Sequence, residues 1–317
     1  MAHNNRRIAF IGFGEVGTTF SRDFIAAGGH DVAIYDILLD SEPGRTQITN
    51  KAKSIGVTVC SSAAEAAKDA AVIFSAVTAS SAYAVAKQAG TYLRPGQILI
   101  DVNSVSPSTK RKDAVAVEAS GADYVEAAVM SPIKPFGLAV PITLGGKRSA
   151  DVKAMLEPAG MKLTLGVDEI GKASAIKMCR SVMVKGLEAL TTECMLVSRL
   201  YGVEEEVLSS LRVSYPGINW DEFPGYKIGR LLEHGRRRAD EMREAADTVR
   251  ETGLTPLITT ATADRIEWVA DTVDKKPELK TAADADWRAS LDTLVKITGL
   301  RHIGDIDKDS ADKDSAA

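Results

Sequence analysis

The sequence has few of the residues that build metal sites and disulfide frameworks. Its 317 residues include three cysteines and four histidines. Cys60, Cys179 and Cys194 show no CxxC spacing, so the sequence predicts no disulfide framework. The histidines lie far apart and form no HExxH pair, so we predict no metal site. For Cys179 we expect a buried position in a helix rather than a role as a nucleophile.

The chain also lacks an excess of positive charge and any long hydrophobic run. A net charge of -4 gives no overall attraction for nucleic acid or anionic lipid. Charge or glycine interrupts every apolar run before the roughly 18 residues that a membrane helix needs. The opening MAHNNRR passes directly into a strand-like run and leaves no room for a signal peptide. We therefore expect no nucleic-acid partner, no membrane segment and a cytoplasmic location.

Short apolar runs alternate with helix-like segments between Arg7 and about Leu144. The runs RIAFIG, DVAIYD, AAVIFSAV and QILIDV are mostly apolar, as expected for strands that are covered on both faces. This alternation is typical of a parallel sheet with helices on each side. We therefore predict an α/β Rossmann-type domain over residues 1–166.

The pattern changes after Gly166, where apolar residues recur at spacings of three and four. We predict an all-α substrate and dimerisation domain over residues 167–303. The segment up to Gly202 is predicted to contain one helix of more than twenty residues, which suits a spine between domains or across a dimer interface. Residues 215–226 contain two prolines and two glycines and are predicted to form a loop. Further helices are expected at about 227–251, 255–274 and 280–298.

Two charged segments of this half are interpreted as solvent-exposed. The last eleven residues, DKDSADKDSAA, repeat DKDSA and lack apolar side chains apart from alanine, so we predict a disordered tail over residues 304–317. Arg237 and Glu241 stand four residues apart, the spacing of an ion pair on one face of a helix. The arginine triplet at 236–238 is therefore interpreted as a solvated helix face rather than an anion site.

The stretch IAFIGFGEVGTTF contains a GxGxxG motif that follows an apolar run and opens a helix. In dinucleotide-binding folds the first glycine allows a tight turn, the second lets the backbone approach a pyrophosphate, and the third brings helix against strand. Amide groups at the helix start would face the phosphates, where the helix dipole favours negative charge. A purely structural turn is the alternative. We predict that cofactor binding involves Gly12, Phe13, Gly14, Glu15, Val16 and Gly17.

An acidic residue, Asp36, ends the second apolar run about twenty residues further on. Its carboxylate can accept hydrogen bonds from an adenosine ribose and would repel a 2′-phosphate, so NAD is favoured over NADP. The alternatives are that Asp36 only caps a loop, or that Arg45 folds back to receive a phosphate, which keeps NADP possible. Ligands of open α/β sheets bind at the carboxyl ends of the strands. The nicotinamide is therefore expected near Ala76, Val77, Thr78 and Asn103.

Three further stretches resemble the motifs of a known family. DVNSVSP at 101–107 resembles the family's DxSTxxP loop, EAAVMSP at 126–132 resembles its DAPVSGG segment, and GKASAIKMCRS at 171–181 resembles its GxGxxxKxxxN helix. Together with the glycine loop, these motifs resemble the β-hydroxyacid dehydrogenase family, which includes 3-hydroxyisobutyrate and 6-phosphogluconate dehydrogenases. The C-terminal helices, with SYPGINW at 214–220, resemble the shorter helical domain of members with unassigned substrates.

The resemblance implies an NAD(P)-dependent oxidoreductase that transfers a hydride between nicotinamide and a small hydroxy compound, chiefly a hydroxyacid. It implies that Lys177 is the general acid and base, and it places Ser181 where the family has an asparagine that orients the substrate hydroxyl. It implies that Asn103 and Ser104 lie in the loop that binds substrate and nicotinamide. Ser131 falls in the segment that holds the substrate carboxylate. The resemblance also implies a homodimer.

The residues around Lys177 support a chemical role independently. Its neighbours Ile176 and Met178 indicate partial burial, and desolvation lowers the pKa of a lysine toward neutrality. Ser181, one turn on, shares its face and can bond the same substrate oxygen. The alternative is a lysine with its ammonium group in solvent. Ser106, directly before Pro107, is predicted to cap a helix.

Two other functions stay open on the sequence alone. Relatives that reduce imines keep the cofactor domain and vary the residue at the lysine position, so the presence of Lys177 favours an alcohol substrate. A non-catalytic NAD(H)-binding sensor or interaction protein is the second alternative. Lys177 disfavours this reading, while Ser181 and Pro132, which depart from the family's motifs, mildly favour it.

Overall fold

The computed structural model describes residues 7–28, 30–166, 168–282 and 286–302. The chain forms two compact units, Met1–Cys179 and Arg180–Ala317, whose boundary falls inside a long helix. The domain boundary expected after residue 166 lies before that helix and stays a prediction. The predicted disordered tail, residues 304–317, lies outside the described residues.

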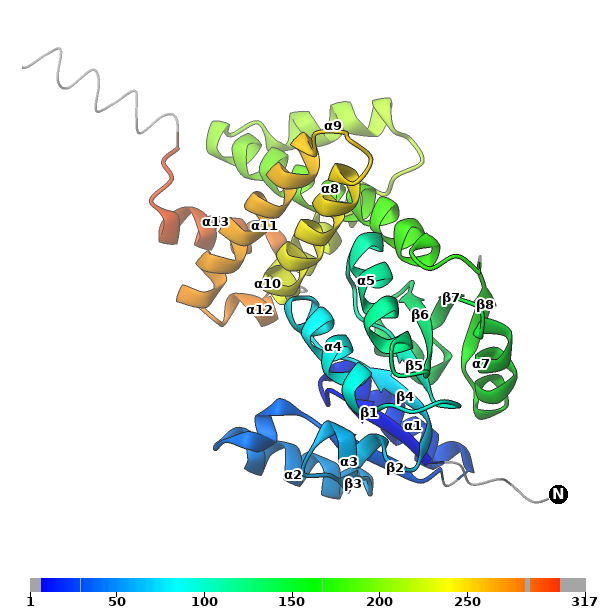
Figure 1. The fold of residues 1–317 in the computed structure, drawn as a ribbon. Helices are drawn as coiled ribbons and strands as arrows, with labels where there is room; N and C mark the ends of the chain where they lie inside the picture. Colours follow the sequence, from blue (N-terminus) through cyan, green and yellow to red (C-terminus); the bar gives the residue numbers. More distant parts are fainter. Residues whose placement is uncertain (1–6, 29, 167, 283–285, 303–317) are drawn as a thin grey trace, which may run out of the picture. The chain divides into compact units, whose positions relative to one another are not determined.

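An eight-stranded sheet lies at the centre of the first unit, as far as the described residues show, with the order β3-β2-β1-β4-β5-β6-β7-β8 (Figure 1). The strands from β3 through β6 are parallel to their neighbours, and their order is that of dinucleotide-binding folds. The Rossmann-type fold is thus confirmed. The strands are β1 (Arg7–Ile11), β2 (Val32–Tyr35), β3 (Thr58–Val59), β4 (Ala70–Ser75), β5 (Ile98–Asp101), β6 (Asp123–Val129), β7 (Pro141–Gly145) and β8 (Lys162–Leu165).

The last two strands were not expected from the sequence, and they make the sheet mixed rather than wholly parallel. β7 runs antiparallel to β6, and β8 runs parallel to β7. The connection between Val129 and Pro141 holds only short helical turns, including α6 (Ile133–Phe136). Parallel neighbours need a crossover of a dozen or more residues, usually a helix, so this connection returns the chain in the opposite direction.

Helices cover both faces of this sheet. Side chains of β1 alternate between the faces: Phe10 packs with Phe20 and Phe24 on one side, while Ala9 and Ile11 face the other. The second face is lined largely by alanines, which let its helices approach the strands closely. The covering helices are α1 (Glu15–Gly28), α2 (Gly44–Ile55) and α7 (Ser149–Leu156) on the first face, and α3 (Ala63–Ala67), α4 (Ala82–Tyr92) and α5 (Pro107–Glu118) on the second.

The second unit is helical in all its described elements, which confirms the expected class. It continues α8 (Lys172–Tyr201), the predicted long helix, and adds α9 (Glu204–Ser214), α10 (Phe223–Arg250), α11 (Leu257–Lys275), α12 (Leu279–Ala282) and α13 (Trp287–Thr298). The loop predicted at 215–226 ends early, because α10 begins at Phe223. Pro224 fits the first turn of that helix, where its missing N–H group costs no hydrogen bond. α9 was not expected from the sequence.

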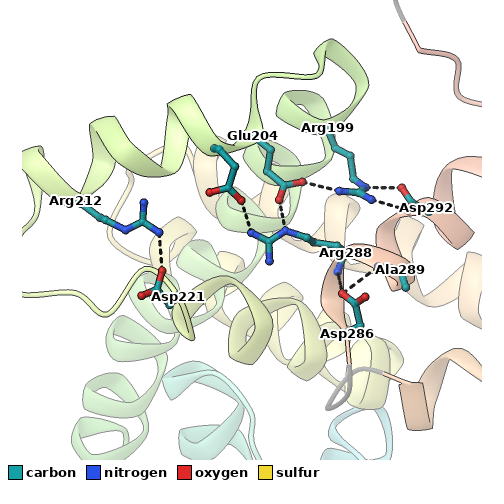
Figure 2. A network of polar contacts seen from close by, with 9 residues as sticks. Arg199, Glu204, Arg212, Asp221, Asp286, Arg288, Ala289 and Asp292 are labelled. Atoms are coloured by element: carbon teal, nitrogen blue, oxygen red, sulfur yellow. Dashed lines mark hydrogen bonds and ion pairs between the residues drawn. The ribbon is translucent and has the colours of Figure 1, made fainter.

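A network of ion pairs joins α13 to the end of α8 and the start of α9 (Figure 2). Glu204 accepts hydrogen bonds from Arg199, at 2.8 Å, and from Arg288. Arg199 also bonds both carboxylate oxygens of Asp292, one of them at 2.6 Å. Asp286 caps α13 by accepting from the N–H of Arg288 at 2.9 Å. Ion pairs therefore hold α13 against the end of α8 and the start of α9, in addition to the packing of its apolar face.

The structure bears on three further features noted in the sequence, and it shows that the expectation for Cys179 is wrong. No helix among the described residues is long and apolar enough to cross a membrane. The described residues contain no cluster of three potential metal-binding side chains. Cys179 is exposed, not buried, because the buried face of α8 at this point passes through Met178 instead.

We predict that Tyr92→Phe stabilises the protein. The Tyr92 hydroxyl is buried and has no hydrogen-bond partner among the described residues, and burial raises the pKa of Tyr92 to about 12. Removing an unsatisfied buried hydroxyl should raise the free energy of unfolding by about 1–3 kcal/mol in urea titrations at neutral pH. The unfolded chain releases this proton near pH 10, so the wild type loses further stability between about pH 10 and 12.

The difference in free energy of unfolding between Tyr92→Phe and the wild type should therefore increase when the titration is repeated at about pH 11. Tyr83→Phe is the matched control, because Tyr83 lies on the same helix with its side chain 47% exposed. Equal effects of the two substitutions at both pH values would contradict the assignment.

Candidate functional site

The glycine loop after β1 has the three local environments that a pyrophosphate-binding turn requires. Gly12 has a φ of 95°, and a Cβ there would lie 2.3 Å from the carbonyl oxygen of Ala76. A Cβ on Gly17 would lie 2.3 Å from the carbonyl oxygen of Gly12, so this glycine brings α1 against the turn. Gly14 has no atom within 4 Å of its Cβ position. The space over Gly14 is open to a ligand, as the motif predicts.

Asp36, directly after β2, connects the second strand to the glycine loop. One carboxylate oxygen accepts from the N–H of Phe13 at 2.7 Å, and the other accepts from the N–H of Leu38 at 2.9 Å. Asp36 therefore caps the following turn and also holds the glycine loop. Each carboxylate oxygen has more than one acceptor position, so a ribose hydroxyl can still bond there. Arg45 donates to the carbonyl oxygen of Leu39 at 2.8 Å.

Asn103 joins the loops that follow β4 and β5. Its side-chain oxygen accepts from the N–H of Val77 at 2.7 Å, and its amide nitrogen donates to Ser75 Oγ at 2.9 Å. The side chain is buried. Ala76 donates its N–H to the carbonyl oxygen of Ile11, at the start of the glycine loop. The residues predicted around the nicotinamide thus belong to loops that are hydrogen-bonded to one another. Asn103 connects the loop after β5 to the loop after β4.

A buried ion pair lies directly beneath this loop and was missed from the sequence. Asp101 accepts from Lys110 Nζ at 2.9 Å, from the Tyr124 hydroxyl at 2.7 Å and from the N–H of Asn103 at 2.8 Å. Burial and the neighbouring Asp101 raise the pKa of Tyr124 well above its ordinary value. The available signal was the acid at the end of the apolar run QILID, since an acid in a buried strand needs partners.

Lys177 and Ser104 are brought together in the first unit. Lys177, in the second turn of α8, donates from Nζ to Ser104 Oγ at 2.5 Å. Ser104 follows Asn103 in the loop after β5, and both side chains of the pair are half-buried. The contact places an amine that can exchange a proton beside the loop where a nicotinamide is expected. Two residues predicted from motifs 73 positions apart therefore meet.

The start of α8 is held by Glu126, a second acid that was missed. Glu126 lies in β6 with its side chain buried, and its carboxylate accepts from the N–H groups of Gly171 at 2.7 Å, Ala173 at 3.1 Å and Ser174 at 3.2 Å. These N–H groups have no partner inside the helix, and the helix dipole favours a negative charge there. A Cβ on Gly145 of β7 would lie 2.4 Å from the Glu126 carboxylate, so only glycine leaves room for it.

The other serines singled out in the sequence make different contacts. Ser131 follows the end of β6, half-buried, and its side chain makes no hydrogen bond to a described residue. Ser106 caps α5 by accepting from the N–H of Thr109 at 3.3 Å, which confirms the predicted cap. Ser181 belongs to the second unit, where its hydroxyl accepts a hydrogen bond from Lys185.

Comparison with known families gives one match within each unit. Residues 7–104 match the family described as NADP oxidoreductase coenzyme F420-dependent, and residues 199–269 match a domain of unknown function, DUF1932. An uncharacterized 28.5 kDa protein from the 7S RNA 5′ region of Methanothermus fervidus is 30% identical over 84% of this chain and 99% of its own. The mitochondrial 3-hydroxyisobutyrate dehydrogenase of Drosophila melanogaster is 25% identical over 68% of this chain and 65% of its own.

Solved structures extend the similarity over both units. A conserved hypothetical protein from Sinorhizobium meliloti 1021 is 32% identical, with a TM-score of 0.74 over 93% of this chain and 97% of its own. A conserved protein of unknown function, MTH1747, which is described as structurally similar to 3-hydroxyacid dehydrogenases, is 30% identical. Its TM-score is 0.66 over 84% of this chain and 97% of its own. The chain therefore belongs to the β-hydroxyacid dehydrogenase family, a family of NAD(P)-dependent dehydrogenases that act on hydroxyl groups.

We predict that Glu126→Gln loosens the first turn of α8. Glutamine keeps one acceptor oxygen but turns an NH₂ group toward the helix N–H donors. The free energy of unfolding should fall by about 1.5–3 kcal/mol, the range for hydrogen bonds to charged groups. Glu169→Gln is the matched control, because that carboxylate is 64% exposed and pairs with Lys172 at 3.7 Å. Urea titrations that give both variants the same stability would contradict this role.

Proposed function

We propose that this member of the family oxidises and reduces a small hydroxyacid, with Lys177 as the general acid and base. The observation that carries the proposal is the hydrogen bond of 2.5 Å between Lys177 Nζ and Ser104 Oγ. It holds the amine at the carboxyl end of β5, where ligands of such sheets bind. The named relative from Drosophila melanogaster is a 3-hydroxyisobutyrate dehydrogenase, which supports a hydroxyacid as the substrate class.

The proposed reaction needs one proton and one hydride to leave the substrate. In oxidation, neutral Lys177 takes the proton of the substrate hydroxyl while the carbon loses its hydrogen as hydride and the C=O bond forms. In reduction, the ammonium form of Lys177 returns the proton to the carbonyl oxygen. A nicotinamide, when bound by the glycine loop and the loops after β4 and β5, would supply the hydride chemistry in both directions. Ser104 holds the amine in place during both directions.

The local charge favours NAD over NADP in this proposal. The Asp36 carboxylate would repel a 2′-phosphate, and Ile37, Leu38 and Leu39 after it bring no cation. Arg45 is engaged with the carbonyl oxygen of Leu39 at 2.8 Å. Lys51 lies beside the glycine loop, with Nζ 3.5 Å from the carbonyl oxygen of Phe13, and it keeps NADP possible.

We predict that Lys177→Met slows turnover strongly and leaves cofactor binding intact. Oxidation of 3-hydroxyisobutyrate and L-serine is followed by the absorbance of the reduced nicotinamide, with NAD⁺ and with NADP⁺. The loss of the general base should lower kcat by roughly 10²–10⁴-fold. NADH affinity, measured by quenching of tryptophan fluorescence, should not change. Lys172→Met is the control, because Lys172 lies on the same helix with its side chain 52% exposed.

A variant that retains full turnover would remove Lys177 from the mechanism. NADH binding by a wild type that oxidises no hydroxyacid would instead support the non-catalytic alternative, an NAD(H)-binding sensor.

We also propose a homodimer that forms through α8. Large apolar side chains at a spacing of seven residues, Met183, Leu190 and Val197, are 65%, 66% and 47% exposed. Residues seven apart lie on one stripe of a helix, as in helices that pair along their length. An exposed apolar stripe of this kind is typical of an interaction surface. The position of the stripe on the long helix agrees with the spine expected from the sequence.

We predict that Met183→Glu with Leu190→Glu converts the dimer to a monomer. Two charges in an apolar interface would remain unpaired and desolvated, which costs several kcal/mol. Sedimentation equilibrium measures the mass of the wild type and of the variant. Val213→Glu, at a position of α9 that is 82% exposed and outside the stripe, should remain a dimer. A monomeric wild type would contradict the proposed homodimer.

A further inference from the structure

The loop between β5 and α5 buries all its residues except Ser104. From Asp101 to Pro107 every other residue is buried, and Ser104 is half-buried. Its hydroxyl accepts a hydrogen bond from Lys177 Nζ at 2.5 Å. The buried residues on either side of Ser104 therefore determine where this hydroxyl lies.

Lys110, near the start of α5, holds this loop at both ends. The residue is 1% exposed. Its ammonium group pairs with Asp101 Oδ1 at 2.9 Å and also donates to the carbonyl oxygen of Asp101 at 3.0 Å, where the loop begins. Its backbone N–H donates to the carbonyl oxygen of Ser106 at 3.0 Å, where the loop ends. One residue thus fixes the two ends of the loop relative to each other.

The carboxylate that Lys110 holds also bonds the loop itself. Asp101 Oδ1 accepts from the N–H of Asn103 at 2.8 Å, and Oδ2 accepts from the Tyr124 hydroxyl at 2.7 Å. Burial raises the pKa of Tyr124 well above its ordinary value, so the phenol stays protonated and donates. Asn103 directly precedes Ser104 in the chain. A continuous set of polar contacts therefore joins Lys110 to the residue before Ser104.

The ion pair between Lys110 and Asp101 contributes direction rather than stability. Taking both charges out of water costs about as much as their attraction returns, and apolar residues of similar volume often stabilise a fold as well. Apolar residues have no preferred direction of contact, whereas each hydrogen bond restricts both a distance and an angle. The pair therefore suits a place where a loop must be held in one position.

We infer that Lys110 is a positioning residue for Lys177: by holding Asp101 it fixes the loop that carries Ser104, and Ser104 holds the amine. The inference rests on the proposed function, in which that amine exchanges a proton with the substrate. These residues all belong to the first unit. A displacement of about 1 Å at a reacting group can cost roughly 10²-fold in rate, so a small shift of the loop is enough to matter.

The test uses the full-length protein with 3-hydroxyisobutyrate and L-serine as probes, at a saturating concentration of the nicotinamide cofactor that the wild type uses. Lys110→Met should lower kcat by roughly 10²-fold. KM should change little, because Lys177 acts in the chemical step. Lys112→Met is the control, since Lys112 lies on the same helix with an exposed side chain, and its kcat should equal that of the wild type.

A second control accounts for lost stability. Val152→Ala removes methyl groups from a fully buried position in α7, which packs on the opposite face of the sheet from α5. Its melting temperature should fall, while kcat per folded protein should not change. Melting temperature and NADH affinity are measured for every variant.

A double-mutant cycle with Ser104 separates positioning from stability. Ser104→Ala should itself lower kcat, and in that background Lys110→Met should have little further effect, because the contact through which Lys110 acts is already missing. A loss of folded protein would lower the rate by the same factor in both backgrounds. Equal losses would therefore overturn the inference, as would an unchanged kcat in either single variant.

Lys110→Met leaves the Asp101 carboxylate buried without its cation, so a further variant removes both charges. In Lys110→Met with Asp101→Asn, the amide offers one acceptor oxygen to the two donors, Tyr124 and the N–H of Asn103, that the carboxylate accepts with two. We expect the melting temperature to recover relative to Lys110→Met and kcat to stay low. A wild-type kcat in this double variant would overturn the positioning role.

Failure of the proposed function has a different signature. A wild type that binds NADH but oxidises neither probe would overturn the proposed function, and this inference with it. An active wild type whose turnover depends on Ser104 but not on Lys110 would overturn the inference alone.

Discussion

One buried carboxylate fixes the start of α8, and the placement of Lys177 depends on it. Glu126 accepts three N–H groups from residues 171–174. The first N–H groups of a helix lack partners, and an isolated buried carboxylate is very costly, so each satisfies the other. A residue of the sheet thereby determines where the helix begins. Lys177 lies one turn further on, which is how an amine from α8 reaches Ser104 in a strand-end loop.

Buried polar side chains also satisfy backbone and side-chain groups elsewhere along the carboxyl edge of the sheet. The register aligns Ser75 with Asp101, and Asp101 with Glu126, so these polar side chains form one row across β4, β5 and β6. Two of them bond Asn103 in the loop after β5: Ser75 accepts from its side-chain amide, and Asp101 accepts from its N–H. The apolar strands end at this row. Buried polar side chains there hold the loops rigid, which prepares a site before any ligand enters.

Features carried by local patterns could be predicted from the sequence. The glycine loop, the alternating runs and the cap at Ser106 each depend on neighbouring residues, and the structure has all of them. Lys177 and Ser104 were predicted as site residues from separate motifs. Glu126 could not be predicted, because its partners lie 45 residues or more further along the chain. The reversal at β7 was missed for a related reason: strand direction depends on what the connection can span.

The two lysines of α8 have different surroundings, and this difference explains why they are suited to different tasks. Lys185 is buried and its charge is balanced by Glu241, 3.0 Å away, so it is stabilised as a fixed donor. Lys177 is half-buried and bonds Ser104, a neutral hydroxyl that can serve either protonation state of an amine.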